Sequence, residues 1–273
     1  MGMRSKDQWI ERSKAWTKTV APGISADDTF NKMIIAEVRI RPGEKLLDLA
    51  SGTGNPAISI AHSMNGTGEV FCTDLTDKML QSARQRAENL NLDIVKFIAA
   101  DMASLPFTDN KFDAITCRFG AMFSEDKVSV SLESHRALKK GGRAAYIVWG
   151  SYDENPPFHI PRRAVCSYLG IEEGPTPKRH SMSAPGDLEK MLTGGNFSRV
   201  EERELRYTNP IEDINDYVTR NLNRSFSKET KDLTKANFGD LRQTVIKAWK
   251  PFIKDGILLV PNYARLGLGW KTS

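Results

Sequence analysis

The feature that most constrains the fold is the alternation of short apolar runs with helix-patterned stretches between residues 45 and 149. The apolar runs fall at 45–49, 69–73, 94–98, 112–117 and 143–149, and the helical stretches between them at 56–63, 77–90 and 127–138. A helix between two such runs carries the chain back to the start of the sheet, so that successive strands lie parallel. The sequence therefore predicts an α/β fold in which helices cover a parallel sheet.

Residue signals at the starts of two helices support this reading. Asn55 is the expected N-cap of the first helix, with Pro56 at its first helical position, and Thr76 precedes Asp77 at the second. Asn and Thr side chains accept hydrogen bonds from the free N–H groups of a first helical turn. We therefore expect both helices to begin at these residues.

Beyond Trp149 the pattern is less regular. Proline and glycine interrupt an aromatic-rich segment, and we interpret Asn155-Pro156-Pro157-Phe158 as a turn. The sheet then resumes, with a helix expected at 185–192, a strand at 197–207, helical stretches at 211–223 and 228–253, and a last strand at 257–270. We expect one domain with insertions.

Length and composition exclude several classes of protein. The 273 residues suffice for one large core, and no apolar run approaches the roughly 20 residues that a membrane span requires. The first 18 residues are polar and charged where a signal peptide would be apolar. We therefore expect a cytoplasmic protein without a membrane span.

Cysteine spacing and charge distribution argue against metal and nucleic acid. Cys72, Cys117 and Cys166 show no CxxC spacing, which disfavours disulfides and a zinc site, and we expect no metal. The net charge of +5 is spread along the chain with acidic residues interleaved. This pattern is typical of a solvated surface, and we expect no nucleic-acid partner.

The segment Leu47-Asp48-Leu49-Ala50-Ser51-Gly52-Thr53-Gly54-Asn55-Pro56-Ala57 carries the most chemical information. It runs from a strand through a glycine turn into a helix, and glycines at 52 and 54 allow positive φ and close approach of the backbone to a ligand. Asp48 stands just before the turn, suited to hydrogen-bonding an ammonium group. Dinucleotide-binding turns have a third glycine where this chain has Ala57, although alanine there does not exclude them.

Acidic residues also follow the next two strands. Asp74 comes about twenty residues after the turn, where a carboxylate can hold both hydroxyls of a ribose. Asp101 and Met102 follow the third strand and suit the amino group and ring face of an adenine. Three successive strand ends thus offer groups for an amino acid, a ribose and a base.

These residues resemble the class I S-adenosylmethionine (SAM)-dependent methyltransferases, and within them the ubiquinone and menaquinone C-methyltransferase-like group. The resemblance covers residues 46–142 strongly and the rest only in outline. The matching residues are Asp48, Gly52, Thr53, Gly54, Asp74, Asp101-Met102, Leu105-Pro106-Phe107, Asp109-Asn110-Lys111-Phe112-Asp113 and Leu138-Lys139-Lys140-Gly141-Gly142.

The resemblance implies a fold and a cofactor. It implies a Rossmann-like, seven-stranded sheet in the order 3-2-1-4-5-7-6, flanked by helices and ending in an antiparallel pair, with an N-terminal helical cap and helical insertions. The cofactor is SAM and its product S-adenosylhomocysteine (SAH). We expect a single methyltransferase domain over 1–273, with a cap at 1–40, a SAM-binding core at 41–150, a lid-like insertion at 151–184, and sheet completion at 185–273 that contains a helical insertion at 210–255.

The resemblance also implies residue roles at the cofactor. Gly52 and Gly54 back the methionine moiety, Asp74 binds the ribose, and Asp101 meets the adenine amino group, while Leu75 and Met102 enclose the adenine ring. The full set expected to bind the cofactor is Asp48, Ala50, Gly52, Thr53, Gly54, Asp74, Leu75, Asp101, Met102 and Arg118.

Residues on the methyl-acceptor side are less well defined. Arg118 follows the fourth strand and either binds the acceptor or the cofactor carboxylate, or forms a salt bridge. His159 is the better placed histidine for a general base, and His62, His135 and His180 are placed less favourably. Catalytic candidates are therefore His159 and Arg118, and the residues expected at the acceptor are Trp9, Trp16, Phe119, Tyr152 and His159.

Methyl transfer from a sulfonium needs mainly alignment and exclusion of water, so no strong catalytic motif is expected. The function we predict is methylation of a small molecule that is phenolic, quinone-like, isoprenoid or another secondary metabolite, at carbon or oxygen. The alternatives are a non-catalytic or regulatory SAM-binding protein, an RNA or protein methyltransferase, and an NAD-dependent oxidoreductase. A homodimer is left open.

Overall fold

The structure is a computed structural model that describes residues 28–272. Trp9 and Trp16, which were predicted to lie at the acceptor, are outside the described residues, as is most of the expected N-terminal cap. Among the described residues, no helix is both long and apolar enough to cross a membrane.

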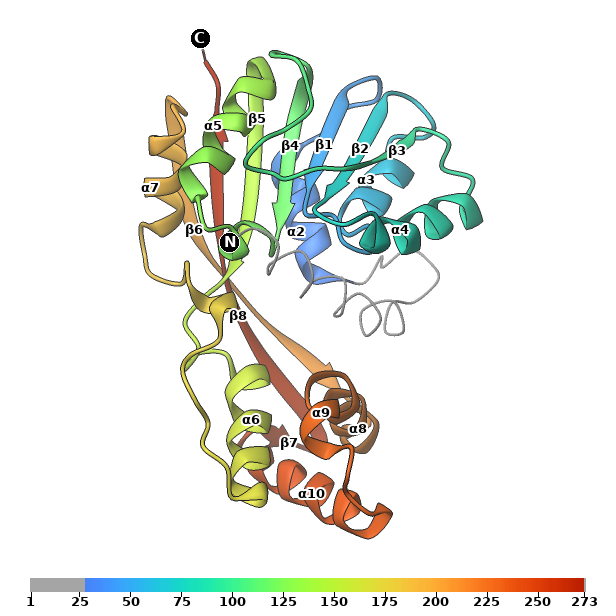
Figure 1. The fold of residues 1–273 in the computed structure, drawn as a ribbon, viewed down its shortest axis with the longest axis vertical. Coiled ribbons are helices and arrows are strands. Elements are labelled where there is room, and N and C mark those ends of the chain that lie inside the picture. Colours follow the sequence, from blue (N-terminus) through green and yellow to red (C-terminus); the bar gives the residue numbers. More distant parts are fainter. Residues whose placement is uncertain (1–27, 273) are drawn as a thin grey trace. The chain divides into compact units, whose positions relative to one another are not determined.

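One sheet organises the fold, with strand order β3-β2-β1-β4-β5-β8-β6 (Figure 1). The strands are β1 (Lys45–Leu49), β2 (Glu69–Asp74), β3 (Val95–Ala99), β4 (Phe112–Arg118), β5 (Leu138–Trp149), β6 (Arg199–Ile211), the two-residue β7 (Ile253–Lys254) and β8 (Ile257–Trp270). Parallel pairing joins β3, β2, β1, β4 and β5 in that order. Because β7 only pairs with the start of β8, β8 is the seventh long strand, and the predicted order 3-2-1-4-5-7-6 is confirmed.

The strand β8 runs back along the sheet. Near its carboxyl end, Lys271 exchanges backbone hydrogen bonds with Gly141 and Gly142 near the start of β5. β8 is therefore antiparallel to β5. At the other side of β8, Ser198 next to the start of β6 donates its N–H to the carbonyl of Trp270 at the end of β8, so that the last pair is also antiparallel, as the resemblance implied.

Helices flank the sheet and follow the predicted alternation. Those of the first half are α2 (Thr29–Val38), α3 (Ala57–Ser63), α4 (Asp77–Asn89) and α5 (Lys127–Ala137), followed by α6 (Pro156–Leu169) and α7 (Asp187–Gly194). The later helices are α8 (Ile214–Ser225), α9 (Ser227–Thr230) and α10 (Lys235–Ala248), and short 3₁₀ turns cover Ala121–Phe123, Lys178–His180 and Lys250–Phe252. α3 packs on β2, α4 packs on β2 and β3, and α2 packs against β4. Since layers of helices cover the sheet, β1 is buried from Leu46 to Leu49 without an exposed alternate residue.

The described chain divides into two compact units. Unit 1 comprises residues up to Val148, together with Ala184–Arg203 and the residues from Arg265 onward; unit 2 comprises Trp149–Ser183 and Glu204–Ala264. Unit 1 contains the parallel strands and α2 to α5. Unit 2 has its own apolar core, in which α10 packs against α6 and α8 around the fully buried Trp249. The predicted segment boundaries stay predictions.

Two local expectations are wrong. α3 begins at Ala57 with Pro56 at the N-cap position, so Asn55 is not the cap; its side chain instead accepts hydrogen bonds from Asn31 and Arg86. The Asn155-Pro156-Pro157 sequence is the start of the 14-residue α6, not a turn. Proline lacks an N–H group, which the first helical turn does not use, so paired prolines fit there.

Candidate cofactor site

The glycine turn follows β1 and bends sharply. Ala50, Gly52 and Gly54 all have positive φ, at 50°, 54° and 98°. A Cβ atom on Gly54 would lie 2.7 Å from Cγ1 of Ile58 and 3.2 Å from Cβ of Ala83. Glycine at 54 is therefore required both by the backbone conformation and by the packing of the turn against α3 and α4.

Asp48 is fully buried at the carboxyl end of β1. Its Oδ1 accepts a hydrogen bond from Thr116 Oγ1 at 2.6 Å, whereas no described residue donates to the buried Oδ2. Burial raises the pKa of Asp48 to about 7, against the opposing effect of the Thr116 and Ser51 hydroxyls. A cation near this carboxyl would favour its ionised form, because opposite charges stabilise each other in a buried site.

Asp74 joins the end of β2 to the glycine turn. Its Oδ2 accepts a hydrogen bond from the Gly52 backbone N–H at 3.0 Å, and Oδ1 accepts one from Thr76 N–H at 3.2 Å. Burial raises the pKa of Asp74, although these backbone donors favour the carboxylate. The side chain is thereby fixed beside the turn, at the adjacent strand end.

Asp101 lies in the turn after β3 and is exposed. Its Oδ1 accepts from Ala103 N–H at 2.9 Å, and its carbonyl accepts from Ser104 N–H at 3.0 Å. Ala100 N–H donates to the Asp74 carbonyl at 2.9 Å, so that the turn starts in register with β2. The structure thus brings Asp48, Asp74 and Asp101 to the same edge of the sheet, and Leu75 and Met102 follow the last two of them, each half-buried.

Arg86, which was not predicted from the sequence, binds the backbone of the glycine turn. It lies on α4 and is only 4% exposed, and its Nη1 donates to the Thr53 carbonyl at 2.5 Å. Its Nη2 donates to Asn55 Oδ1 at 3.4 Å, and that oxygen also accepts from Asn31 of α2. An arginine on the same helical face as Met79, Ala83 and Ala87 was the available signal, since a charged group on a buried face needs partners.

Arg118 and Phe119 end β4 within unit 1. Arg118 Nη2 forms a 2.6 Å ion pair with Asp28, the N-cap residue of α2, and its side chain is 14% exposed. Phe119 has a φ of 58° and packs edge-on against Phe30, with ring centroids 5.0 Å apart. The salt-bridge alternative for Arg118 is therefore present, and contact with cofactor or acceptor stays a prediction for both residues.

The predicted residues Tyr152 and His159 belong to unit 2. Their rings are 6.0 Å apart, and the Tyr152 hydroxyl donates to Glu173 at 2.5 Å. His159 is half-buried, and burial lowers its pKa. Unit 2 also contains a cavity of about 300 Å³, lined by Glu154, Arg206, Tyr207, Thr208, Pro261, Asn262 and Tyr263.

His180 has the more constrained geometry of the two unit 2 histidines. It is 5% exposed, its Nδ1 lies 2.7 Å from the Gly150 carbonyl, and burial lowers its pKa. With Nδ1 donating its proton, Nε2 is left as an acceptor, and no described residue donates to it. Sequence alone gave no sign of this, because the carbonyl partner lies 30 residues away.

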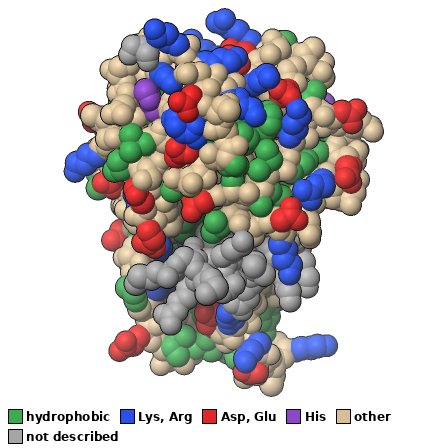
Figure 2. Space-filling view, turned by 45° about the horizontal axis from the view of Figure 1, so that its top comes forward, with side chains coloured by type: hydrophobic (Ala, Val, Ile, Leu, Met, Phe, Trp, Pro, Cys, Tyr) green, Lys and Arg blue, Asp and Glu red, His purple; other side chains and the backbone are tan. Residues whose placement is uncertain are grey.

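Charges at the opposite, amino-terminal edge of the parallel strands are mostly paired. Lys45 and Lys96 both bind Glu69, Lys139 binds Asp113 at 2.8 Å, and Arg143 binds Glu44 at 2.7 Å. Figure 2, which turns the upper end of Figure 1 forward, shows basic and acidic side chains interspersed there. Among the described residues, no three or more His, Cys, Asp or Glu side chains are grouped to hold a metal ion, and the three cysteines are free.

The strand order, the glycine turn after β1 and the carboxylates at successive strand ends are those of a Rossmann-like fold of the kind found in methyltransferases. Residues 23–165, just over half of the chain, match the ubiE/COQ5 methyltransferase family, and the chain belongs to this family.

Curated relatives match part of the chain. It is 40% identical over 110 residues to the ubiquinone/menaquinone biosynthesis C-methyltransferase UbiE of Cupriavidus metallidurans, and 38% identical over 109 residues to UbiE of Burkholderia mallei. Each match covers 40% of this chain and 44% of the relative. The similarity thus spans less than half the length of either relative.

Solved structures share the fold at low sequence identity. YcgJ from Bacillus subtilis is 19% identical with a TM-score of 0.56, over 89% of this chain and 98% of that one. The [4+2]-cyclase SpnF is 17% identical with a TM-score of 0.59, over 91% and 82%. Phosphoethanolamine N-methyltransferase 2 of Haemonchus contortus, in complex with SAM, is 17% identical with a TM-score of 0.56, over 89% and 52%. One neighbour is a cyclase, so the fold alone does not fix the reaction.

The described residues fit SAM. SAM has a cationic ammonium and sulfonium, two ribose hydroxyls and an adenine amino group, and all three kinds of group are attracted by carboxylates. A buried Asp48 with one unpartnered oxygen, Asp74 beside the turn and an exposed Asp101 supply acceptors at three successive strand ends.

Proposed function

We propose that this chain transfers a methyl group from SAM to a small-molecule acceptor. The observation that carries the proposal is the placement of Asp48, Asp74 and Asp101 at adjacent strand ends, with the glycine turn between the first two. The ubiE/COQ5 family membership supports it. Open α/β sheets bind ligands at the carboxyl ends of their strands, which is where these side chains lie.

Within this proposal, each group of residues binds one part of the cofactor. Asp48, Ala50, Gly52, Thr53 and Gly54 hold the methionine moiety, with Asp48 facing its positive charge. Asp74 accepts from the ribose hydroxyls, and Asp101 accepts from the adenine amino group. Leu75 and Met102 lie against the adenine ring.

SAM, when bound, supplies a methyl group on a sulfonium leaving group. The chain's part is to bind and orient the cofactor and to exclude water, because an in-line displacement depends on alignment. Arg118 cannot take a proton, since a guanidinium stays protonated, and its proposed role is to orient an anionic group. His159 stays the proposed base for an acceptor that must lose a proton.

The acceptor is the finer part of the proposal. The curated relatives are named for ubiquinone and menaquinone biosynthesis, which supports a quinone-like or phenolic acceptor methylated at carbon or oxygen. The matched residues end at 165, before most of unit 2. We therefore include isoprenoid and other small acceptors in the proposal.

A label-transfer experiment tests this function. The chain is incubated with methyl-tritiated SAM and a panel of phenols, hydroquinones and isoprenoids, and with RNA and a protein mixture in parallel. Label in the organic extract that depends on the acceptor, and that Asp74→Ala reduces, supports the proposal. Label in RNA or protein favours a macromolecular acceptor, and SAM binding without transfer to any class favours a non-catalytic SAM-binding protein.

A further inference from the structure

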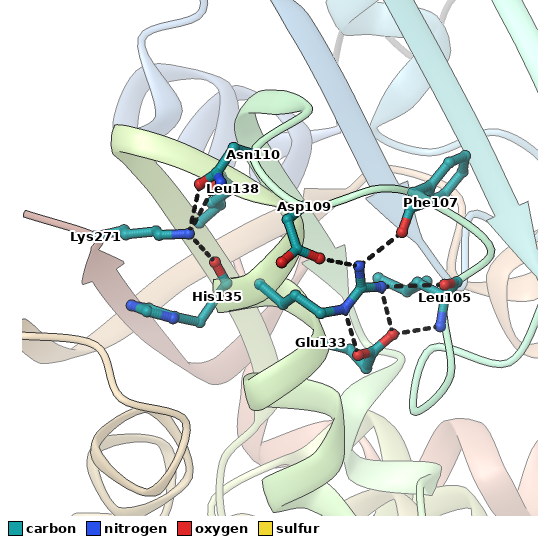
Figure 3. Close-up of polar contacts among 9 residues, drawn as sticks. Leu105, Phe107, Asp109, Asn110, Glu133, His135, Leu138 and Lys271 are labelled. Carbon is teal, nitrogen blue, oxygen red and sulfur yellow. Dashed lines mark hydrogen bonds and ion pairs between the residues drawn. The ribbon is translucent and has the colours of Figure 1, made fainter. Parts of the chain in front are cut away.

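A group of side chains on α5, called the clamp below, binds the backbone segment that follows the turn containing Asp101. Arg136, in the last turn of α5, donates from Nη1 to the Phe107 carbonyl at 2.7 Å and from Nη2 to the Leu105 carbonyl at 3.2 Å. The same guanidinium donates to the carboxylates of Asp109 and Glu133, which Figure 3 shows near the two carbonyls. One side chain thus fixes two backbone positions on a loop about 30 residues away in sequence.

Two carboxylates complete the clamp. Glu133 accepts from Arg136 Nε at 2.7 Å and Nη2 at 2.8 Å, and it also accepts from the Leu105 backbone N–H at 2.7 Å. Asp109 accepts from Nη1 at 2.8 Å. All five N–H donors of the guanidinium therefore have acceptors in a fixed fork, and the Arg136 contact lowers the pKa of Glu133.

The clamped segment directly continues the turn that contains Asp101. The turn is held at its start by the Ala100 to Asp74 hydrogen bond, and it closes through Ser104 N–H and the Asp101 carbonyl. Leu105, the next residue, is held by the clamp on both its N–H and its carbonyl. Asp101 is therefore placed by β2 on one side and by α5 on the other.

Side-chain packing also fixes the clamped segment against the sheet. Leu105 and Phe107 are buried, and the Phe107 ring packs edge-on against Phe71 and Phe112 with centroids 5.6 and 4.9 Å away. This packing contributes to holding the loop against the sheet. An additional arginine that binds backbone carbonyls restricts the position of the loop along the sheet edge as well, because its planar fork tolerates little displacement.

We propose that Arg136 and Glu133 are positioning residues for adenine recognition, acting through Leu105 on the turn that contains Asp101. The inference rests on the proposed function, because it takes Asp101 as the acceptor for the adenine amino group. Neither residue contacts the ligand. Their effect is to hold a single, exposed carboxylate where only a base with an amino group at that position binds well.

The test compares two ligands that differ at one group. Calorimetry measures binding of SAH and of S-inosylhomocysteine, in which an oxo group replaces the adenine amino group, to wild type, Arg136→Met, Arg136→Lys and Glu133→Gln. Wild type is expected to prefer SAH. Arg136→Met is expected to weaken SAH binding about tenfold and binding of the inosyl ligand about twofold or less, so that the preference falls about fivefold or more. Arg136→Lys keeps the positive charge but lacks the planar set of guanidinium donors. It replaces Arg136→Met in the test if that variant does not fold.

Lys271 provides the matched control. Its Nζ donates to the carbonyls of His135 and Leu138 and to Asn110 Oδ1 at 2.8–2.9 Å, at the end of the same helix and beyond the clamped segment (Figure 3). Lys271→Met is expected to lower Tm as Arg136→Met does, and to leave the ligand preference at the wild-type value.

Three outcomes overturn the inference. An unchanged preference in the Arg136 and Glu133 variants, with a lowered Tm, shows that the clamp only stabilises the loop. If wild type binds both ligands equally, the adenine amino group does not contribute to recognition. A folded wild type that binds neither ligand overturns the proposed function itself, and the inference with it.

Discussion

Unit 1 and unit 2 differ in how their charged side chains are held. In unit 1, Asp48 and Asp74 are buried at strand ends, where Asp74 accepts from the backbone N–H of Gly52 and Asp48 accepts from the hydroxyl of Thr116 on the neighbouring strand β4. In unit 2, the core around Trp249 is apolar, and Arg206 pairs with Glu154 and Glu204 at half-exposed positions. A site built from successive strand ends can thus be read from short motifs, whereas side chains brought together by packing cannot.

The first prediction tests whether the two units serve separate purposes. Trp249→Ala in unit 2 removes a side chain that is fully buried and is expected to lower the free energy of unfolding by about 3–5 kcal/mol. The affinity for SAH, measured under conditions where the variant is folded, is expected to change by about twofold or less, because all proposed cofactor residues belong to unit 1. Chemical denaturation and calorimetry measure the two effects. A large loss of SAH affinity in the folded variant would contradict separate roles for the two units.

The second prediction contrasts two glycines with positive φ. Gly54→Ala is expected to lower the free energy of unfolding by about 2–4 kcal/mol, because it adds backbone strain and a Cβ atom 2.7 Å from Ile58. Gly170→Ala in unit 2 adds strain alone, since nothing lies within 4 Å of its Cβ, and is expected to lower it by about 1–2 kcal/mol. Urea denaturation of both variants compares them. SAH binding is expected to be greatly weakened only in Gly54→Ala, and equal binding in both would argue against the turn as the cofactor site.

The third prediction concerns the pH dependence caused by Asp48. Its pKa is about 7 in the folded chain and 3.8 in the unfolded chain, so that between these values the folded state holds a proton that the unfolded state lacks. The stability contributed by this group is therefore fully present below pH 3.8 and is lost as the pH rises to about 7. The difference in unfolding free energy between wild type and Asp48→Asn is expected to fall by at most about 1.4 kcal/mol per pH unit over that window.

Binding of SAM to the same group sharpens this prediction. If the cofactor cation faces Asp48, binding near pH 7 releases a proton, because the cation favours the carboxylate. Calorimetry in two buffers of different ionisation enthalpy measures that release, and Asp48→Asn is expected to reduce it. Equal proton release by the two proteins would place the charge of the cofactor elsewhere.

Most strands of the sheet could be predicted closely from the sequence. The predicted strand at 45–49 is β1, and the predicted last strand at 257–270 is β8. β5 begins at Leu138, five residues before the predicted start, because Leu138 to Gly142 has the composition of a turn although Leu138 already pairs with Phe112. Turn-forming residues cannot be recognised as part of a strand until the strand that pairs with them is known.

The site residues also differ in how well they could be predicted from the sequence. The acidic residues at 48, 74 and 101 were predicted, because each follows an apolar run that fixes its place at the sheet edge. Arg86 and the Arg136–Glu133 pair were not, because their partners are backbone carbonyl and N–H groups 28–33 residues away. His180 depends in the same way on the Gly150 carbonyl. Sequence motifs thus revealed groups proposed to touch the cofactor more readily than those that hold the backbone around it.

The central claim is that the edge formed by β1, β2 and the turn after β3 binds SAM, and ribose binding at Asp74 tests it most directly. Calorimetry measures SAH and 2′-deoxy-SAH with wild type, Asp74→Ala and the exposed unit 2 control Asp153→Ala. The account predicts that Asp74→Ala weakens SAH binding by about 1–3 kcal/mol and that the 2′-hydroxyl matters in wild type and Asp153→Ala but not in Asp74→Ala. Absence of SAH binding by folded wild type, or equal binding by wild type and Asp74→Ala, would contradict it.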